Sequence, residues 1–385
     1  MKHTKIAIIF LAFFFMLSTT SACESENNTE LEEQSEDMDE DTTDEENQED
    51  EENQEEDENE EEDDSNDNTD NEDENDDETD ENDSNSTIVG THGRLQVSGK
   101  QILDKNDSVI QLRGMSLFWS QWMGQYYTKE TVNWLADDWK CNIVRAAMGV
   151  EDDGGYLTNK EVEKQKVFTV IDAAIEKGIY VIVDWHSHHA EDHLEEAKSF
   201  FSEIAQKYGN TPNLIYETYN EPLSGVSWTE VLKPYHEAVI AEIRKYDTDN
   251  LIICGTSTWS QDVDHVIGNK INDPNVAYTL HYYAATHKEE LRAKAQSALN
   301  NNIPLFVTEY GLSEASGGGS LNIEESKTWW NFLDTNHISW CNWSIADKEE
   351  LSAALQPGAS GNGGWTEGQL TTSGKAVRDE ILEKN

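Results

Sequence analysis

The sequence has few basic residues, few cysteines and almost no long apolar run. Its 385 residues include 27 Lys and Arg against 79 Asp and Glu, for a formal net charge of −52. Binding to nucleic-acid phosphates requires clusters of Lys and Arg, so this balance argues against a nucleic-acid partner. Besides Cys23, the chain contains only Cys141, Cys254 and Cys341. Their odd number and wide spacing predict buried free thiols instead of a disulfide framework.

The one long apolar run lies near the start of the chain. Two lysines precede residues 6–17, whose 12 apolar residues are too few to span a bilayer as a helix. Small residues follow up to position 22, and Cys23 comes next. This order resembles a bacterial lipoprotein signal, except that Thr20 stands where such signals usually carry leucine. We predict a signal peptide over 1–22, followed either by lipidation of Cys23 or by cleavage and free secretion.

Acidic residues are concentrated in the segment after the signal. Residues 24–86 contain 37 Asp and Glu and no Lys or Arg, whereas 87–385 contain 42 acidic and 25 basic residues. Like charges repel along such a segment, and it has too little apolar surface to offset the entropy lost on folding. We predict a disordered acidic linker over 23–88 and a folded domain over 89–385. The linker would be a spacer from an anionic cell envelope or a solubilising tail.

The remaining chain alternates apolar runs of β type with amphipathic helical patterns. Strands that are nearly all apolar, such as 180–183, suit a parallel sheet that is buried on both faces. Eight such alternations predict an α/β fold of the (β/α)8 TIM-barrel type, preceded by a hairpin over 94–104. A doubly wound open sheet is the alternative, but no Gly-rich turn follows the first strand. The helix of the fifth crossover, around 261–270, is the least clearly patterned. The expected barrel strands are 109–117, 142–149, 179–186, 213–220, 250–257, 276–283, 304–310 and 339–345.

Polar and aromatic side chains gather where these strands end. In a (β/α)8 barrel the active site lies at the carboxyl ends of the strands, which form one rim. Seven of the eight predicted strands end in a side chain that is suited to chemistry or to stacking. These residues are Arg145, Asp184, Trp185, His186, Asn220, Glu221, Trp259, His281, Tyr283, Glu309 and Trp343.

Two glutamates in this set face each other. Glu221 ends the fourth predicted strand and Glu309 ends the seventh, on opposite sides of the barrel. Glycoside hydrolysis needs such a pair, because one carboxylic acid protonates the leaving oxygen while a carboxylate attacks the anomeric carbon. Two carboxylates close together cannot both ionise cheaply, so one stays protonated as the acid. The alternative is two surface glutamates that cap helices or form salt bridges.

Eight segments, in order along the barrel, carry a resemblance to a known family. They are Arg113-Gly114-Met115-Ser116, Val144-Arg145-Ala146-Ala147-Met148, Val183-Asp184-Trp185-His186, Tyr219-Asn220-Glu221-Pro222, Thr258-Trp259-Ser260-Gln261, His281-Tyr282-Tyr283, Thr308-Glu309-Tyr310-Gly311 and Asn342-Trp343-Ser344. With them, residues 91–385 resemble glycoside hydrolase family 5, in its bacterial endoglucanase (cellulase) branch. The resemblance implies an endo-acting, retaining β-1,4-glucanase that needs no cofactor. No separate carbohydrate-binding module is visible in the sequence, so we expect soluble or amorphous cellulose as the substrate instead of crystalline cellulose. It implies Glu221 as acid/base and Glu309 as nucleophile, with carboxyl groups roughly 5–5.5 Å apart.

The same resemblance implies roles for the neighbouring polar residues. Arg145 and Tyr283 would orient the nucleophile and keep it ionised. Asn220 would bond the sugar 2-hydroxyl, and His186 and His281 would orient the substrate and the acid/base.

Aromatic residues at the rim predict how a glucan binds. The flat face of a pyranose stacks on an indole ring, and Trp119, Trp122, Trp259 and Trp343 all lie in or beside loops at the carboxyl ends of strands. By resemblance Trp122 and Trp343 would hold sugars on the non-reducing side, Trp259 would hold the leaving-group side, and Lys348 would bond a distal sugar. The tryptophans in helical patterns are expected to pack instead: Trp134, Trp139, Trp329 and Trp330.

Two departures from the family pattern leave the substrate open. Phe118 stands where some relatives have histidine, and Tyr310 where many have tryptophan. The same mechanism on β-mannan or mixed-linkage β-glucan therefore remains an alternative. A non-catalytic glycan-binding protein of the cell surface is another, although it would not need the glutamate pair. We expect an extracellular monomer, secreted or tethered to the outer face of the membrane, with β-1,4-glucan as its partner.

A run of histidines raises the possibility of a metal-dependent hydrolase. His186, His188, His189 and His193 lie close together, and such a site would also enlist His281 and Asp347. A binuclear barrel site usually takes a His-x-His pair from its first strand, which here ends in Met-Ser-Leu. We therefore expect no metal, and we expect His188 and His189 to be solvated loop residues.

Overall fold

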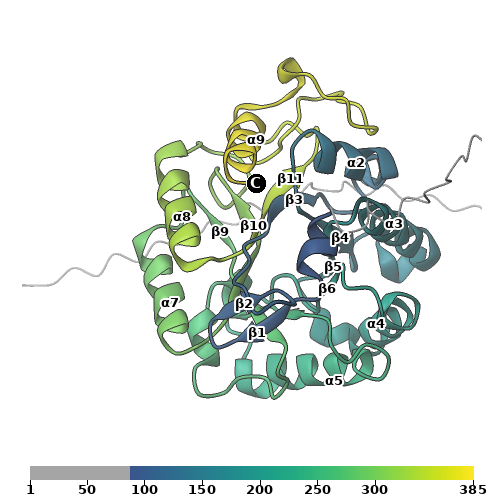
Figure 1. Cartoon of the computed structure of the whole chain (residues 1–385), viewed down its shortest axis with the longest axis vertical. Helices are drawn as coiled ribbons and strands as arrows, with labels where there is room; N and C mark the ends of the chain where they lie inside the picture. The colour runs from purple at the N-terminus through teal and green to yellow at the C-terminus, as the bar shows by residue number, and fades with distance from the viewer. Residues whose placement is uncertain (1–86) are drawn as a thin grey trace, which may run out of the picture. The chain divides into compact units, whose positions relative to one another are not determined.

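The structure is a computed structural model, and it describes residues 87–385. Parallel strands in this part of the chain close into a barrel around a central axis (Figure 1). The pairing of the last barrel strand with the first closes the ring, and both β8 and β9 pair with β10, so these two short strands share one of eight positions. The predicted (β/α)8 fold is confirmed. The predicted signal peptide, Cys23 and nearly all of the predicted linker lie outside the described residues.

The barrel strands are buried on both faces, which explains their apolar sequences. Every residue of β4 and β5 is buried, and the two strands pair in parallel register over seven residues. Such strands read as continuous Val, Ile and Ala runs because no side faces water. The strands of the barrel are β3 (Arg113–Leu117), β4 (Ile143–Gly149), β5 (Tyr180–His186), β6 (Leu214–Glu217), β7 (Ile252–Cys254), β8 (Val276–Thr279), β9 (Tyr282–Tyr283), β10 (Leu305–Gly311) and β11 (Trp340–Ile345).

Helices surround the barrel and bury one face against it (Figure 1). Side chains cap several of them: Thr128 accepts a hydrogen bond from Thr131 N, and Thr371 accepts one from Gly374 N. Aromatic rings fill the layer between helix and strand, for example where Trp329 stacks on Tyr282 with ring centroids 3.9 Å apart. The outer helices are α2 (Lys129–Asp137), α3 (Tyr156–Lys177), α4 (Leu194–Tyr208), α5 (Lys233–Ile243), α7 (Glu289–Asn300), α8 (Ile323–Asn336) and α9 (Thr372–Lys384).

Short elements occupy the two ends of the barrel. The predicted hairpin is formed by β1 (Gln96–Ser98) and β2 (Gln101–Leu103), whose Ile102 packs on the interior cluster that contains Ile143 and Ile182. Helix α1 (Ile88–His92) precedes it. The fifth crossover has only the short α6 (Ser257–Ser260) and η4 (Val263–Val266) in place of a full helix. The other short helical segments are η1 (Gly124–Tyr126), η2 (Ala190–His193), η3 (Trp228–Leu232) and η5 (Glu367–Gln369).

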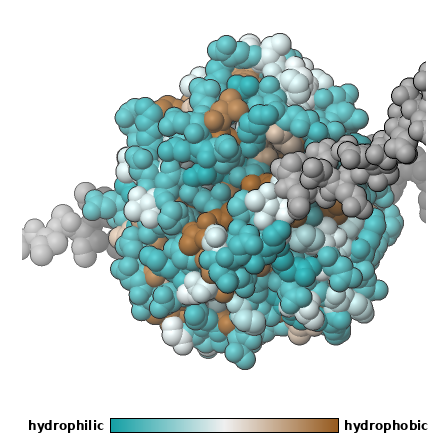
Figure 2. All heavy atoms as spheres, viewed as in Figure 1, coloured by the Kyte–Doolittle hydropathy of each residue, from teal (hydrophilic) through white to brown (hydrophobic). Residues whose placement is uncertain are grey.

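The face of the molecule drawn in Figure 2 is mostly polar, and the thiols are buried. In the view of Figure 2 the face is mostly hydrophilic, with small separate hydrophobic patches. Cys141, Cys254 and Cys341 are buried and free, as the sequence predicts. Burial raises the pKa of each of these thiols and keeps them protonated. Over residues 87–385 no helix has the length and apolar character to traverse a bilayer.

A glycine in β3 sets how closely two barrel strands approach. A Cβ added at Gly114 would lie 1.8 Å from Ile143 O on the neighbouring strand. We expect Gly114→Ala to lower the free energy of unfolding by about 1–3 kcal/mol, because the strands must move apart to admit the methyl group. Urea unfolding measures this. Gly368→Ala is the matched control, since its nearest heavy atom would be 3.9 Å away. Equal losses in the two variants would contradict the steric account.

Candidate active site

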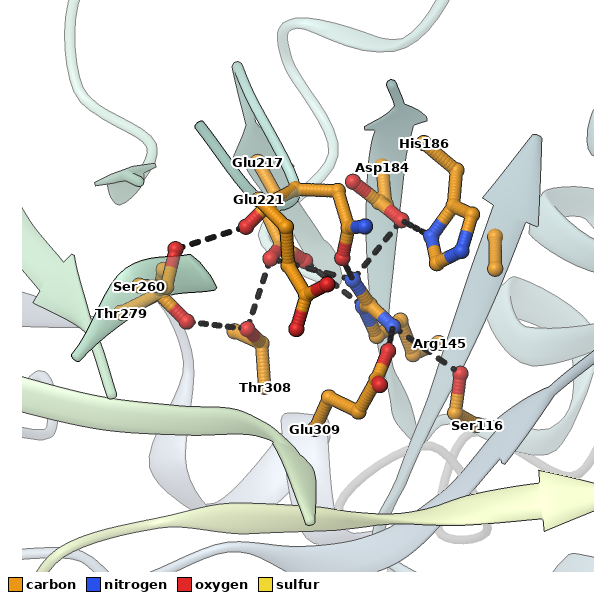
Figure 3. A network of polar contacts seen from close by, with 12 residues as sticks. Ser116, Arg145, Asp184, His186, Glu217, Glu221, Ser260, Thr279, Thr308 and Glu309 are labelled. Carbon is orange, nitrogen blue, oxygen red and sulfur yellow. Dashed lines mark hydrogen bonds and ion pairs between the residues drawn. The ribbon is translucent and has the colours of Figure 1, made fainter. Parts of the chain in front are cut away.

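The guanidinium of Arg145, on β4, lies at the centre of the carboxyl rim and is fully buried. Its Nε and Nη2 donate to Glu217 at 2.8 and 3.2 Å, and its Nη1 donates to Glu309 Oε2 at 3.1 Å. Nη2 also lies 2.8 Å from Asp184 Oδ2 and donates to Asn220 Oδ1 at 2.7 Å. Figure 3 shows Arg145, Asp184, Glu217 and Glu309 converging from separate strands. One positive charge therefore contacts three carboxylates.

Burial and charge oppose each other in this cluster. Desolvation raises the pKa of Asp184 and that of Glu217 to about 7, although the charge of Arg145 acts to lower both. Burial alone would lower the pKa of Arg145, but the three carboxylates raise it well above its ordinary value. The guanidinium is thus always charged, and the two buried carboxyls titrate near neutral pH.

Glu309 and Glu221 approach each other above this cluster. One carboxylate oxygen from each, together with a ring nitrogen of His281, lies within 4.8 Å of the others. Tyr283 donates its hydroxyl to Glu309 Oε1 at 2.7 Å, and Arg145 holds the second oxygen. Glu309 is 5% exposed and lies in β10, so a strand buried on both faces fixes its position.

Glu221 is held differently, because β6 ends four residues before it. Its backbone N–H donates to Ser187 O at 3.2 Å, which attaches this irregular segment to the end of β5. His281 Nδ1 lies 2.8 Å from Glu221 Oε1, and His188 Nε2 lies 3.2 Å from Oε2. Burial opposes the charge of Glu221, yet the hydrogen bonds from the two histidines lower its pKa to about 2. The expectation that the acid of the pair has a raised pKa is therefore wrong for Glu221, because the histidines outweigh burial. The same bonds raise the pKa of both histidines, against the effect of burial.

His188 is therefore more than the solvated loop residue that the sequence suggests. Its side chain is 35% exposed, but its ring nitrogen bonds the carboxylate of Glu221. No local pattern indicates this bond, because His188 lies in an irregular loop after β5 and the path of that loop sets where its ring points. His189, by contrast, is exposed, and its backbone N–H bonds Glu151 and Ser187.

His186 is fixed as a neutral ring. Its Nδ1 lies 2.7 Å from Asp184 Oδ2, and its ring stacks on Trp343 with centroids 5.1 Å apart and planes 2° apart. Trp119 meets the same ring edge-on at 4.2 Å. Burial and the nearby charge of Arg145 lower the pKa of His186 well below its ordinary value. The histidine and the two indoles form one aromatic wall beside Glu309.

A cleft passes over the two glutamates. A cavity of about 440 Å³ on one side is lined by Trp259, and one of about 220 Å³ on the other is lined by Trp119, Trp122, Trp343 and Lys348. Both cavities reach the two glutamates and Tyr283, so together they form a continuous groove. Trp122 and Trp259 are 50% and 41% exposed, whereas Trp119 and Trp343 are mostly buried. Of the four tryptophans predicted to bind sugars, two thus present exposed rings to the groove and two form part of its wall.

Lys348 and the two departures from the family pattern occupy different places. Lys348 Nζ pairs with Glu350 at 2.5 Å and lies 4.8 Å from the ring of Phe118, which lines the groove. Tyr310 points away from the groove: it is fully buried, stacks on Tyr282, and its hydroxyl bonds a tryptophan of α8. The departure from the family pattern at Tyr310 therefore changes the packing between the barrel and α8 and does not change the lining of the groove.

The segment that carries Trp259 has an unusual backbone. Thr258, Trp259 and Ser260 have φ values of 58°, 53° and 56°, in the left-handed region that side chains disfavour. Thr258 Oγ1 donates to Asp262 at 2.6 Å, and Ser260 Oγ donates to Asn220 O at 2.7 Å. These bonds hold a strained turn in place, and strain of this kind often marks functional segments.

Two side-chain groups within residues 87–385 have the spacing of metal ligands. They are Glu221, His281 and Glu309, and Asp262, Asp264 and His265. In the first group Arg145 already pairs with Glu309, and in the second Lys294 bonds Asp262 at 2.5 Å. Of the histidines and Asp347 that the metal hypothesis enlists, only His281 belongs to either group. In each group, therefore, a basic side chain already pairs with one of the carboxylates.

Sequence reasoning did not single out Glu217 and Thr308. Glu217 lies in an apolar strand and is fully buried, and such a carboxylate must find a cation or hydrogen-bond donors. That rule could have found Glu217 from the sequence. Thr308 donates to it at 2.6 Å, but a threonine in a β-strand has no comparable signal.

A (β/α)8 barrel with two glutamates paired across its carboxyl rim is the arrangement of the TIM-barrel glycoside hydrolases. The particular family follows from comparison with known proteins. The family description "Cellulase (glycosyl hydrolase family 5)" matches residues 103–349, and the chain belongs to this family. The resemblance inferred from the sequence is confirmed.

Relatives and solved structures agree with this assignment. Endoglucanase Z of Dickeya dadantii is 50% identical over 290 residues, which cover 74% of this chain and 66% of that protein. Endoglucanase 5 of Pectobacterium carotovorum is 45% identical over 77% of this chain, but only 59% of its own length is covered. The chain thus spans about two thirds or less of the length of these curated relatives.

Two of the similar solved structures are covered almost completely. One, from Cytophaga hutchinsonii, has 56% identity and a TM-score of 0.77, with coverage of 77% of this chain and 97% of the other. The catalytic domain of a Thermobifida fusca endoglucanase, in complex with cellotetraose, has 34% identity and a TM-score of 0.74, with coverage of 77% and 99%.

The charge cluster predicts a pH-dependent stability. The folded pKa values of Asp184 and Glu217, about 7, exceed the usual value near 4 for an unfolded carboxyl, so the folded state binds more protons between about pH 4 and 7. Stability is therefore lost as pH rises through that window. We expect Arg145→Met to lower the free energy of unfolding by about 3–5 kcal/mol, because three carboxylates lose their buried partner.

The loss should be larger at pH 8 than at pH 5, since protonation relieves the repulsion. Urea unfolding at both pH values measures it. Arg378→Met removes a partly exposed ion pair with Asp138 and serves as the control, with a small loss at either pH. A loss for Arg145→Met that is the same at pH 5 and pH 8 would contradict this electrostatic account.

Proposed function

We propose that this chain is an endo-acting, retaining β-1,4-glucanase that hydrolyses internal bonds of soluble or amorphous cellulose by double displacement. The observation that carries the proposal is the pair Glu221 and Glu309, whose closest oxygens lie within 4.8 Å at the middle of a groove. This spacing supports the retaining geometry, since inverting enzymes hold their carboxyl groups roughly 6.5–9.5 Å apart to admit a water. Relatives that bear the name endoglucanase support the β-1,4-glucan substrate.

In the first step Glu309 acts as the nucleophile. Arg145 and Tyr283 hold its two oxygens and so orient the carboxylate. A new bond forms between a Glu309 oxygen and the anomeric carbon while the bond to the leaving oxygen breaks. Glu221 protonates that leaving oxygen. Because the hydrogen bonds from the histidines lower the pKa of Glu221, we propose that His281, whose Nδ1 lies 2.8 Å from Glu221 Oε1, passes the acid proton to this carboxyl.

In the second step the roles at Glu221 reverse. The carboxylate of Glu221 takes a proton from water as the water oxygen attacks the anomeric carbon. The bond between that carbon and Glu309 breaks, and the nucleophile returns as a carboxylate. Two inversions give net retention. No step needs a cofactor, because the side chains on the rim supply the acid, the base and the nucleophile.

The surroundings support the proposed substrate contacts. Asn220 Oδ1 is held by Arg145, and no residue in 87–385 accepts from its amide N–H₂ group, which would donate to the sugar 2-hydroxyl. The wall that His186 forms with its indole neighbours would bind the sugar at the reacting position. Trp122 would stack sugars on the non-reducing side with Trp119 and Trp343, Trp259 would stack those on the leaving-group side, and Lys348 would bond a distal hydroxyl.

Endo action can be tested with the full chain in the presence of chelator. We expect a fast fall in the viscosity of soluble carboxymethyl-β-1,4-glucan, with few new reducing ends, and loss of both signals in Glu309→Gln. β-Mannan and mixed-linkage β-glucan are assayed in parallel. Activity confined to one of these would keep the mechanism and replace the substrate. No hydrolysis of any of the three polysaccharides would instead favour a non-catalytic glycan-binding protein.

The acid/base assignment predicts a dependence on the leaving group. Glu221→Gln should slow hydrolysis of glycosides with poor leaving groups by about 10²-fold or more, because their oxygen needs a proton as the bond breaks. Activated aryl glycosides need little acid help, so formation of the glycosyl-enzyme from them should be slowed far less. Pre-steady-state release of the aryl group measures this step. Equal losses on both substrates would count against Glu221 as the acid.

We further propose that the enzyme is exported by its N-terminal signal and tethered through lipidated Cys23, with the acidic linker as a spacer. The protein would act as an extracellular monomer. Cys23→Ser should move most of the enzyme from the membrane fraction to the culture medium of a bacterial host, because one or more acyl chains provide the membrane attachment. Enzyme that stays in the membrane fraction after this change would contradict lipidation of Cys23, and wild-type enzyme found mostly in the medium would mean that the natural enzyme is freely secreted.

A further inference from the structure

A buried threonine connects the acid/base to the charge cluster. Thr308 lies in β10 next to Glu309 and is fully buried. Its Oγ1 is 2.6 Å from Glu217 Oε1 and 2.8 Å from His281 Nε2, and it also contacts the hydroxyl of Thr279. Figure 3 shows Thr308 between Thr279 and Glu217. The hydroxyl is therefore the only atom of β10 that bridges Glu217 and the ring of His281 among the described contacts.

The proton inventory of this hydroxyl fixes the direction of each bond. A threonine Oγ1 has one proton and two lone pairs. Both oxygens of Glu217 accept N–H groups of Arg145, and above the pKa of this carboxyl, about 7, it is ionised and can only accept. The proton of Thr308 then goes to Glu217. Its two lone pairs accept from Thr279 and from His281, so Nε2 of His281 must carry a proton.

The consequence reaches the acid/base carboxyl. With Nε2–H committed to Thr308, the proton that His281 gains or loses is the one on Nδ1, 2.8 Å from Glu221 Oε1. The opposite tautomer would direct the Nε2 lone pair at a hydroxyl with no proton left to donate. We propose that Thr308 is a positioning residue that fixes the tautomer of His281, so that Nδ1 exchanges the catalytic proton with Glu221. This inference deepens the proposed function and rests on it.

Charged groups from several elements face the histidine–carboxyl pair. They are Arg145 from β4, Asp184 and His188 from β5 and its loop, Glu217 from β6, Glu309 from β10 and His287 after β9. Thr308 is uncharged, so replacing it leaves this field in place and changes one hydrogen bond to the ring. A shift in the pH profile of a Thr308 variant therefore reports on the bond itself.

Thr308→Val in the full chain removes the hydroxyl and keeps the shape. The buried Nε2–H then has no acceptor, which disfavours the doubly protonated ring. The pair should lose its shared proton at lower pH, and we expect the alkaline limb of kcat/KM to move down by about one pH unit. Hydrolysis of a cellobioside with a poor leaving group should fall by about 10²-fold, and release from the dinitrophenyl cellobioside by much less.

Two further variants give the experiment its controls. Thr308→Ser retains the hydroxyl and should restore the alkaline limb to its original position. Thr256→Val makes the same change at a buried threonine after β7, whose hydroxyl has no hydrogen-bond partner in residues 87–385, and should leave the profile unchanged. Equal losses on both cellobiosides with an unshifted limb would overturn the proposal and reduce Thr308 to a packing residue.

The tautomer of His281 can also be measured directly in protein that retains Thr308, so the result does not depend on whether a Thr308 variant folds. Long-range 15N NMR of histidine-labelled protein, with His281→Asn to assign the ring, should show Nε2 protonated on both sides of the alkaline limb. A neutral ring protonated at Nδ1 alone would overturn the proposal. This readout needs no substrate. An inactive wild-type protein with the expected tautomer would therefore contradict the proposed function, but it would not contradict the inference that Thr308 fixes the tautomer of His281.

Discussion

A single guanidinium, buried at the centre of the rim, holds Asp184, Glu217 and Glu309 together. The side chain of Arg145 has five N–H donors in a rigid fork, and six contacts use them. Each carboxylate comes from a different strand, so the strand register is coupled to the charge arrangement. A lysine would offer the charge but not the fork. The geometry of the site thus depends on one residue that does not itself react.

The two central glutamates become different through their neighbours. Glu309 contacts a permanent cation and a phenol, which fix the orientation of its two oxygens. Glu221 contacts two imidazoles that can give or take a proton near neutral pH. The same side chain therefore supports attack on one side of the groove and proton transfer on the other. Environment, not residue type, separates the roles.

Much of this arrangement follows from the sequence, and the exceptions have physical causes. Apolar runs and the rim rule predict the barrel, whose carboxyl rim carries Arg145 on β4, Glu309 on β10 and Glu221 four residues after β6. The predicted strand bounds are less accurate. β6 and β7 are shorter than predicted, because the chain stops pairing with the neighbouring strands early and continues as the loops of the rim. The bond from His188 to Glu221 depends on a loop path, and the role of Thr308 on contacts across strands. Neither leaves a local pattern.

Trp259 shows how the fold presents a side chain that packing alone does not hold. Its indole is 41% exposed, and three successive residues around it have left-handed backbone conformations. Such conformations cost roughly 1–2 kcal/mol each for residues with a Cβ, so the turn persists only because its surroundings over-determine it. The ring is thereby oriented before any ligand arrives. Conformational entropy that a loose loop would lose on binding has already been lost during folding, which makes the groove a preorganised surface.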